Sequence, residues 1–306
     1  MIAIHPRQLS PLERKNLRKG LFFISPWIIG VLVFTFYPIV YSIVLSFARY
    51  SGLQPPTWIG FQNYIRLFGD ELMRQSLGNT MAYISLAVPI GIVVAILLAL
   101  AMNTSVREVA VYRAALYLPS VLPLFAISFI FIVLINPKYG IVNYALSGFG
   151  LFGSPAGTDY LADPTSALLV IVAIAQLGAG NAALIFLAGL RSIPDTLYEA
   201  ARIDGASRVR SFFSITLPLL SPIILFNAIT AIGAGLQTFQ QAYIITKGGP
   251  NNGTLFYMYY LYDTAFAQAQ LGYACALSLL LFVIGLVLAL VLFTVAKRFV
   301  NYELVS

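Results

Sequence analysis

The chain has 306 residues, of which 59% are hydrophobic and only 9% are charged, and its formal net charge is +7 at pH 7. A typical soluble protein has roughly 45–50% apolar and about 25% charged residues, so this composition argues against a water-soluble fold. The positive charge is not gathered into a basic domain, which argues against nucleic-acid binding. The composition instead predicts an all-α membrane protein.

Six stretches are apolar over about 20 residues, the length that a helix needs to cross a bilayer. None of them contains Asp, Glu, Lys, Arg or His, and in chain order they cover residues 21–47, 80–102, 116–135, 167–187, 217–236 and 273–296. We therefore expect six transmembrane helices in a domain at residues 21–298, with tails at 1–20 and 299–306. Several prolines within or at the start of these spans favour kinks, and they are Pro89, Pro119, Pro123, Pro218 and Pro222.

Lysine and arginine are unevenly divided between the two sides that six spans define. Thirteen of the eighteen lie on the side that holds both termini, and five lie on the other side. Because cytoplasmic loops carry the excess of these residues, both termini are predicted to be cytoplasmic. The outer loops are then residues 48–79, 136–166 and 237–272, and the two longest have enough apolar residues for short interfacial helices. The stretch TKGGPNNGT, at 246–254, is typical of a turn cluster.

The cytoplasmic loop at about residues 190–216 holds seven charged residues in this apolar chain, and it has the pattern helix, turn, helix. Pro194 suits the first turn of the first helix, because its missing N–H is not needed there. Gly205 can adopt the left-handed conformation that ends a helix. Ser207 can then cap the second helix, which leads to the fifth span.

The first of these two helices is too short to be stable alone in water, so one of its faces has to be buried. Ala200 and Ala201 would let another backbone approach closely, and Glu199 and Arg202 flank them. These residues favour a helix that docks on a partner protein. A helix that lies on the membrane surface and only joins two spans is equally compatible with the pattern.

The letters EAA at 199–201, followed by Gly205, Ile215, Leu217 and Pro218, are similar to the EAA loop of permease subunits in bacterial ABC importers. The stretches GFQNYIRLF, YGIVNYAL, TKGGPNNGT and LYDTAF occur in the order found in the sugar-importer branch. The resemblance covers about residues 26–298. It is to the first of the two permease types, as in importers of maltose, lactose and glycerol phosphate.

The resemblance implies a type I ABC importer permease architecture in the bacterial cytoplasmic (inner) membrane. It also implies four kinds of partner: a second homologous permease, two ATPase subunits, an extracytoplasmic solute-binding protein and a sugar-like solute. The short cytoplasmic helix would dock in a cleft of one ATPase and transmit its closure to the spans. The residues that would couple the two subunits are Glu199, Ala200, Ala201, Asp204 and Gly205.

The resemblance also implies that spans four and five contact the solute. Polar amides are costly in lipid and glycine leaves room beside them, so we expect Gln176, Gly180, Asn181, Gln237 and Gln240 to line the substrate pathway. Amides suit a neutral, hydroxyl-rich solute. These side chains could instead bond between helices, or those near 237–240 could lie at the outer interface.

The sequence predicts no catalytic residue, cofactor site or metal site. It lacks the Gly-x-x-x-x-Gly-Lys-Ser/Thr phosphate loop and has one histidine and one cysteine, so ATP and Mg²⁺ would be bound by the partner ATPase. An ion-coupled secondary transporter of neutral solutes is the main alternative, although its ion-coupling acid is missing from the spans. A membrane-integral enzyme would need clustered His, Asp or Glu at one membrane face.

Overall fold

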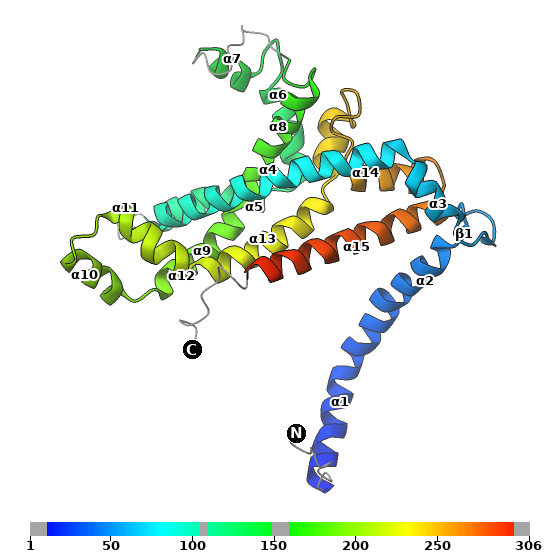
Figure 1. Ribbon diagram of the computed structural model, residues 1–306, viewed down its shortest axis with the longest axis horizontal. Coiled ribbons are helices and arrows are strands. Elements are labelled where there is room, and N and C mark those ends of the chain that lie inside the picture. The colour runs from blue at the N-terminus through cyan, green and yellow to red at the C-terminus, as the bar shows by residue number, and fades with distance from the viewer. Residues whose placement is uncertain (1–10, 105–108, 149–158, 297–306) are drawn as a thin grey trace.

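The computed structural model describes residues 11–104, 109–148 and 159–296, which form a bundle of long helices (Figure 1). The first ten residues of the predicted N-terminal tail and the whole tail at 299–306 lie outside the described residues. The strands in the described part are β1 (Ala48–Arg49) and β2 (Thr57–Trp58), an antiparallel pair in which Ala48 faces Trp58.

Within the described residues, four continuous helices are long and apolar enough to cross a membrane. They are α1 (Pro11–Val31) continued through a π-helical turn at Leu32–Phe36 into α2 (Tyr37–Ser46), α4 (Glu71–Met102), α8 (Pro164–Ala175) continued through Gln176–Gly178 into α9 (Ala179–Ser192), and α15 (Leu271–Ala296). Each begins before its predicted span, because residues ahead of the apolar stretch are helical too, and the first ends at Ser46, one residue before the predicted end. The first helix begins at Pro11, inside the predicted tail.

The third and fifth predicted spans, at 116–135 and 217–236, each contain a sharp bend between two helices, as their prolines predict. The pairs are α5 (Val109–Val121) with α6 (Leu124–Leu134), bent by 94°, and the segment α11 (Arg208–Ser211), π-helical Phe212–Thr216 and α12 (Leu217–Leu219) with α13 (Ser221–Leu236), bent by 64°. If each pair is one span, the described residues hold six candidate spans.

Proline accounts for the position of both bends. Pro123 lies directly before α6, and Pro218 and Pro222 flank the break at Leu220. Proline lacks the N–H that the preceding turn would bond, so the helix breaks most easily there. By contrast, α4 continues through Pro89 without interruption.

The first and third predicted outer loops meet at one end of the bundle. They contain α3 (Gln62–Gly69), the π-helical turn Ala242–Thr246, and α14 (Tyr257–Tyr262) continued by the π-helical turn Asp263–Ala267, while the described part of the second loop contains α7 (Ile141–Gly148). Gln75 Nε2 donates to the Asn251 oxygen at 3.1 Å, and the Gly272 N–H donates to the Tyr50 oxygen at 3.0 Å. The short cytoplasmic helix of the prediction, α10 (Asp195–Ile203), lies at the opposite end (Figure 1).

The loop sequences also form the local structures predicted for them. The two longest outer loops each contain a short helix, α3 and α14. In the predicted turn cluster, Lys247, Gly248, Asn251 and Asn252 have positive φ. Glycine and asparagine tolerate this left-handed backbone better than other residues, so the turn is set by its own sequence.

The packed interior consists of two main groups of side chains. One joins α4 to α9, where Ala95, Ala99 and Ala183 are fully buried and let the two helices approach closely. The other joins α4 to α14 and α15 around Tyr257 and Leu277. Most side chains on α1 and α2 are exposed, and α15 exposes large apolar side chains between Phe282 and Val295, as expected for helices that face lipid or other membrane helices.

The turn into α15 depends on Gly272, because a Cβ atom there would overlap the main-chain oxygen of Ala48. We expect Gly272→Ala to destabilise the protein by about 1–3 kcal/mol, as overpacking does in other cores. The measurement is the melting temperature of the purified protein in detergent. Gly69→Ala is the control, since a Cβ at Gly69 would meet nothing within 4 Å. A Gly272→Ala protein that melts like the wild type would contradict this account.

Candidate functional site

The helix α10 ends in the hydrogen-bonded turn that the sequence predicts. Gly205 has φ +75°, and its N–H donates to the Arg202 oxygen at 3.0 Å. The Ala206 N–H donates to the Ala201 oxygen at 2.8 Å. These two bonds form a Schellman motif, which satisfies helix-end carbonyls that would otherwise lack partners.

Local residues also fix where α11 and α10 begin. Ser207 caps α11, its hydroxyl accepting from the Arg210 N–H at 3.3 Å. Pro194 lies one residue before α10 rather than in its first turn, with ψ 132°, so the helix starts at Asp195. The predicted order of helix, turn and helix is therefore confirmed, with this shift in the position of the proline.

One side of α10 is tied to the following helix, since the Tyr198 hydroxyl lies 2.8 Å from Thr216 Oγ1. The five predicted coupling residues lie together on α10 and the turn after it. Glu199, Ala200, Asp204 and Gly205 are exposed, and Ala201 is half-buried.

The structure adds Ile203, which sequence reasoning missed. Its side chain is 87% exposed, beside the exposed Asp204 and one residue past Arg202. The sequence shows an isoleucine at the end of a charged segment, but it does not show whether the Ile203 side chain is buried or exposed. An exposed apolar side chain between charges fits a contact surface for a partner protein.

Two adjoining hollows, of about 530 and 420 Å³, lie beside the junction of α8 and α9. The first lies between α4, α9 and α13, and the second lies between α5, α6, α8 and residues 237–241. Tyr83 and Thr238 border both of them. The first is lined by Gln176 and Asn181, and the second by Gln237 and Gln240. Neither hollow is lined by Asp, Glu, Lys, Arg or His, so what enters meets many aliphatic side chains with amides, hydroxyls and aromatic rings among them.

The Gln176 side chain is positioned by its own helix. Its Nε2 donates to the Val172 oxygen at 2.7 Å, which leaves Oε1 directed at α4. On α4 this oxygen faces Gly91, where an added Cβ would lie 3.0 Å from Gln176 Oε1. The absence of a side chain at Gly91 therefore gives the amide its space.

The remaining predicted pathway residues fall into two groups. Asn181, Gln237 and Gln240 are exposed on the hollows, and Gln237 Nε2 donates to the Gly233 oxygen of its own helix at 3.3 Å. Gly180 lies apart from both hollows. It is buried against α5, where a Cβ would come 3.1 Å from Ser120 Oγ. Its position supports helix packing and not contact with solute.

Four polar residues that line the first hollow were not among the predicted pathway residues: Tyr83, Asn227, Thr230 and Thr238. Asn227 is 6% exposed, and its Nδ2 donates to the Ile223 oxygen at 2.9 Å. The sequence does place Asn227 in the middle of an apolar span, and this feature could have identified it as a candidate lining residue. Tyr83 carried no such signal, because tyrosine is common in the spans of this chain.

Comparisons with known proteins agree on one family. A family model described as "Binding-protein-dependent transport system inner membrane component" matches residues 87–301. The chain is 40% identical to the probable ABC transporter permease protein YesP of Bacillus subtilis (strain 168), over 95% of this chain and 94% of that one. It is 35% identical to the lactose transport system permease protein LacF of Rhizobium radiobacter, over 94% and 97% of the two chains.

Solved structures are similar over nearly the whole chain. The crystal structure of a bacterial ABC transporter involved in the import of the acidic polysaccharide alginate matches with a TM-score of 0.77 and 25% identity, covering 95% of this chain and all of that one. The alginate transporter in complex with its alginate pentasaccharide-bound periplasmic protein matches with a TM-score of 0.79 and 24% identity, covering 94% and 98%.

Proposed function

Because this chain belongs to the family of binding-protein-dependent transport system inner membrane components, we propose that it is a permease subunit of an ATP-driven importer for a sugar or related polyol. The name of its relative LacF and the alginate transporter structure support a saccharide as solute. The subunit forms half of the translocation pathway in the bacterial cytoplasmic membrane, with six spans and both termini in the cytoplasm. The ion-coupled alternative receives no support from the family match or from these relatives.

The partners follow from this assignment. A second homologous permease completes the pathway, two ATPase subunits bind ATP and Mg²⁺ on the cytoplasmic side, and an extracytoplasmic binding protein delivers the solute. The complex of the alginate transporter with its periplasmic protein supports the last of these. This chain supplies no catalytic residue of its own.

The observation that carries the coupling role is the exposure of α10. The helix is nine residues long, stands at the end of the bundle away from the predicted outer loops, and exposes Glu199, Ile203 and Asp204. So short a helix gains its stability from packing, here through Tyr198 on one side and a partner on the other. We propose that closure of the ATPases moves α10, and with it the helix that leads into α13.

The two hollows supply the proposed pathway, together with the facing surface of the second permease. Asn181 and Gln240 are exposed, so their amides can bond to hydroxyl groups of a passing sugar. Because charged side chains are absent from the lining, an uncharged saccharide is favoured over an acidic one.

The experiment that tests the function is reconstitution. The chain is expressed with its second permease and ATPase, purified and placed in proteoliposomes with the binding protein on one side. We expect uptake of radiolabelled sugar that requires ATP and the binding protein. Uptake that continues without ATP and follows an ion gradient would contradict the proposal.

Filling the first hollow should block the pathway. We expect Gly91→Leu to reduce sugar uptake by at least about tenfold, because the new side chain takes the space in front of the Gln176 amide. Uptake is measured in proteoliposomes with complexes matched for composition. Gly78→Leu, on the same helix but with open space at its Cβ, is the control. Equal uptake by the two variants would show that this hollow is not on the route.

A further inference from the structure

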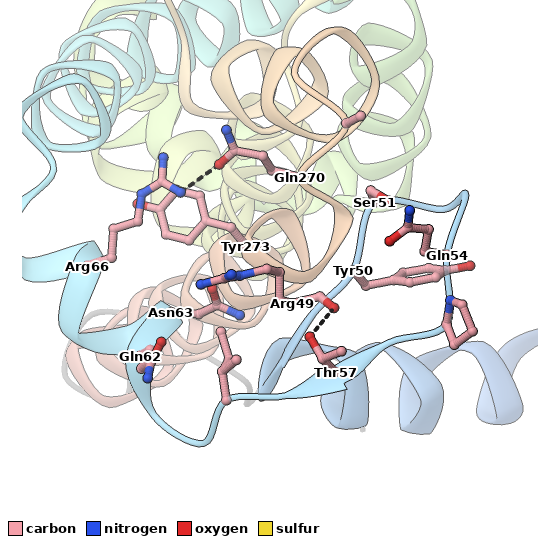
Figure 2. A pocket seen from close by; sticks show the side chains of 13 residues that line it. Arg49, Tyr50, Ser51, Gln54, Thr57, Gln62, Asn63, Arg66, Gln270 and Tyr273 are labelled. Atoms are coloured by element: carbon pink, nitrogen blue, oxygen red, sulfur yellow. Dashed lines mark hydrogen bonds between the residues drawn. The ribbon is translucent and has the colours of Figure 1, made fainter.

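A third pocket, of about 590 Å³, lies at the end of the bundle opposite α10 and apart from the two hollows. Its walls come from the β1–β2 hairpin, from α3 and from the start of α15. Figure 2 shows Arg66 extending from α3 toward Gln270, and Arg49 extending from β1 toward α3. The proposed transport function leaves this pocket without a role.

The pocket is cationic. Its thirteen lining residues include Arg49 and Arg66 and no carboxylate, and the others are mainly amides, hydroxyls and tyrosines. The nearby Asp70 does not line it. Asp70 Oδ2 accepts from the hydroxyls of Tyr260, at 2.6 Å, and Tyr273, at 2.5 Å, and Oδ1 accepts from the Met73 N–H. Burial opposes ionisation of Asp70, but these hydrogen bonds and the charge of Arg66 hold the pKa of its carboxyl below the usual value.

Arg66 is held in place for a ligand. Its Nη1 donates to Gln270 Oε1 at 2.6 Å, and its guanidinium carbon lies 4.1 Å from the centre of the Tyr273 ring. Tyr273 is buried and anchored in turn by Asp70. A guanidinium has five N–H donors in a rigid plane, so donors remain for a second acceptor. Fixing the group in advance lowers the entropy lost when an anion binds.

Arg49 contributes a second cation. The hydrogen bond drawn for Arg49 in Figure 2 involves its main-chain oxygen, which accepts from Thr57 Oγ1 at 3.5 Å. The guanidinium itself is therefore available. The hairpin that carries it is fixed to the bundle by Asn63, whose Nδ2 donates to the oxygens of Ser46 at 2.8 Å and Ala48 at 3.1 Å. Two arginines that approach one space from separate elements suit an anion with several oxygens, such as a phosphate.

The position of the pocket at the ends of candidate spans favours a lipid as the source of that anion. It lies where α2 ends and α15 begins, at the ends of two candidate spans. Large apolar side chains beside it are exposed, including Trp58 at 69%, Phe61 at 68% and Phe68 at 85%. Tryptophan and arginine at span ends sit among lipid headgroups, with the rings toward the acyl chains.

We propose that this pocket binds the phosphate of an anionic phospholipid headgroup, with Arg66 and Arg49 as its ligands. The proposal requires that the chain is inserted in a membrane, and it does not depend on the identity of the transported solute. On the predicted topology the lipid belongs to the outer leaflet. Its binding would hold the β1–β2 hairpin and α3 against the start of α15.

Native mass spectrometry of the purified importer complex tests the proposal. The complex is titrated in detergent with phosphatidylglycerol, with phosphatidylcholine and, separately, with inorganic phosphate. We expect phosphatidylglycerol to be retained in preference to phosphatidylcholine. The double variant Arg49→Gln/Arg66→Gln should bind it roughly tenfold or more weakly, since each basic residue near a membrane surface contributes about 1 kcal/mol.

Two further variants separate the site from general effects. Arg74→Gln removes a cation on the same side of the bundle that does not line the pocket, and it should bind lipid like the wild type. Arg66→Lys keeps the charge but loses the planar fork, so its affinity should fall between those of wild type and double variant. A double variant with unchanged lipid binding would overturn the proposal. So would binding of inorganic phosphate without the lipid, or protection of the two arginines from chemical modification by the binding protein alone.

Discussion

Reversal of the charge in Glu199→Lys is expected to abolish ATP-driven sugar uptake while the chain still inserts and assembles. Glu199 is exposed on α10, next to Ala200, so it makes few contacts that the fold needs. In the assembled importer its carboxylate would be enclosed against the ATPase. Loss of one partner in a desolvated charge pair costs about 2–5 kcal/mol, and a like charge costs more. Coupling should therefore fall by more than tenfold.

Two measurements on the same preparation check this result. Uptake is measured in proteoliposomes, and ATP hydrolysis by the complex is followed with and without the binding protein. We expect hydrolysis that no longer responds to the binding protein. Glu71→Lys is the matched control, because Glu71 is also exposed but lies at the start of α4, at the other end of the bundle. Normal uptake by an assembled Glu199→Lys complex would remove Glu199 from the coupling surface.

Gly205→Val is expected to have a similarly large effect for a different reason. Gly205 has φ +75°, and a non-glycine residue in a left-handed conformation costs roughly 1–2 kcal/mol, with more for a β-branched side chain. No neighbouring atom lies within 4 Å of a Cβ at this position, so strain in the backbone is the whole cost. Relief of that strain would unwind the Schellman motif and turn α10 away from its partner.

The conservative variant Gly205→Asn tests this reason, because asparagine tolerates the left-handed region. We expect uptake close to the wild-type rate for Gly205→Asn and a loss of at least about tenfold for Gly205→Val. Crosslinking between a cysteine at position 203 and the ATPase, in a background without Cys275, would report whether α10 still docks. If both variants lose uptake equally, the requirement at this position is for small size and not for backbone conformation.

Much of the fold could be predicted because its signals are local. Apolar stretches locate the spans, since a helix in lipid needs an unbroken run of such residues. The turn at Gly205 and the cap at Ser207 were likewise readable, because each depends on residues within one or two turns of helix. The helix ends were harder to predict from the sequence, because α1 begins at Pro11 and α4 at Glu71, well before the apolar stretches.

The candidate pathway was only partly predictable. An amide inside a span is a clear polar signal, and Gln176 and Asn181 do face a hollow. A glycine gives no such signal, because it has no side chain to indicate which neighbour its side of the helix contacts. In the structure Gly180 packs on α5. Which face of a helix meets a neighbour depends on the bend and rotation of the other helices, and the bends of 94° and 64° changed those faces.

The sequence by itself determined that this chain is a multi-pass membrane protein with several long apolar helices, and that a short charged helix closes at a glycine, because hydropathy and capping act over neighbouring residues. Only the tertiary structure decided that Arg49, Arg66, Gln270 and Tyr273 surround one pocket. About 200 residues separate Arg66 from Gln270, so no local pattern connects them. Their meeting depends on the packing of α3 against α15, where Leu67 and Tyr273 belong to one group of buried side chains.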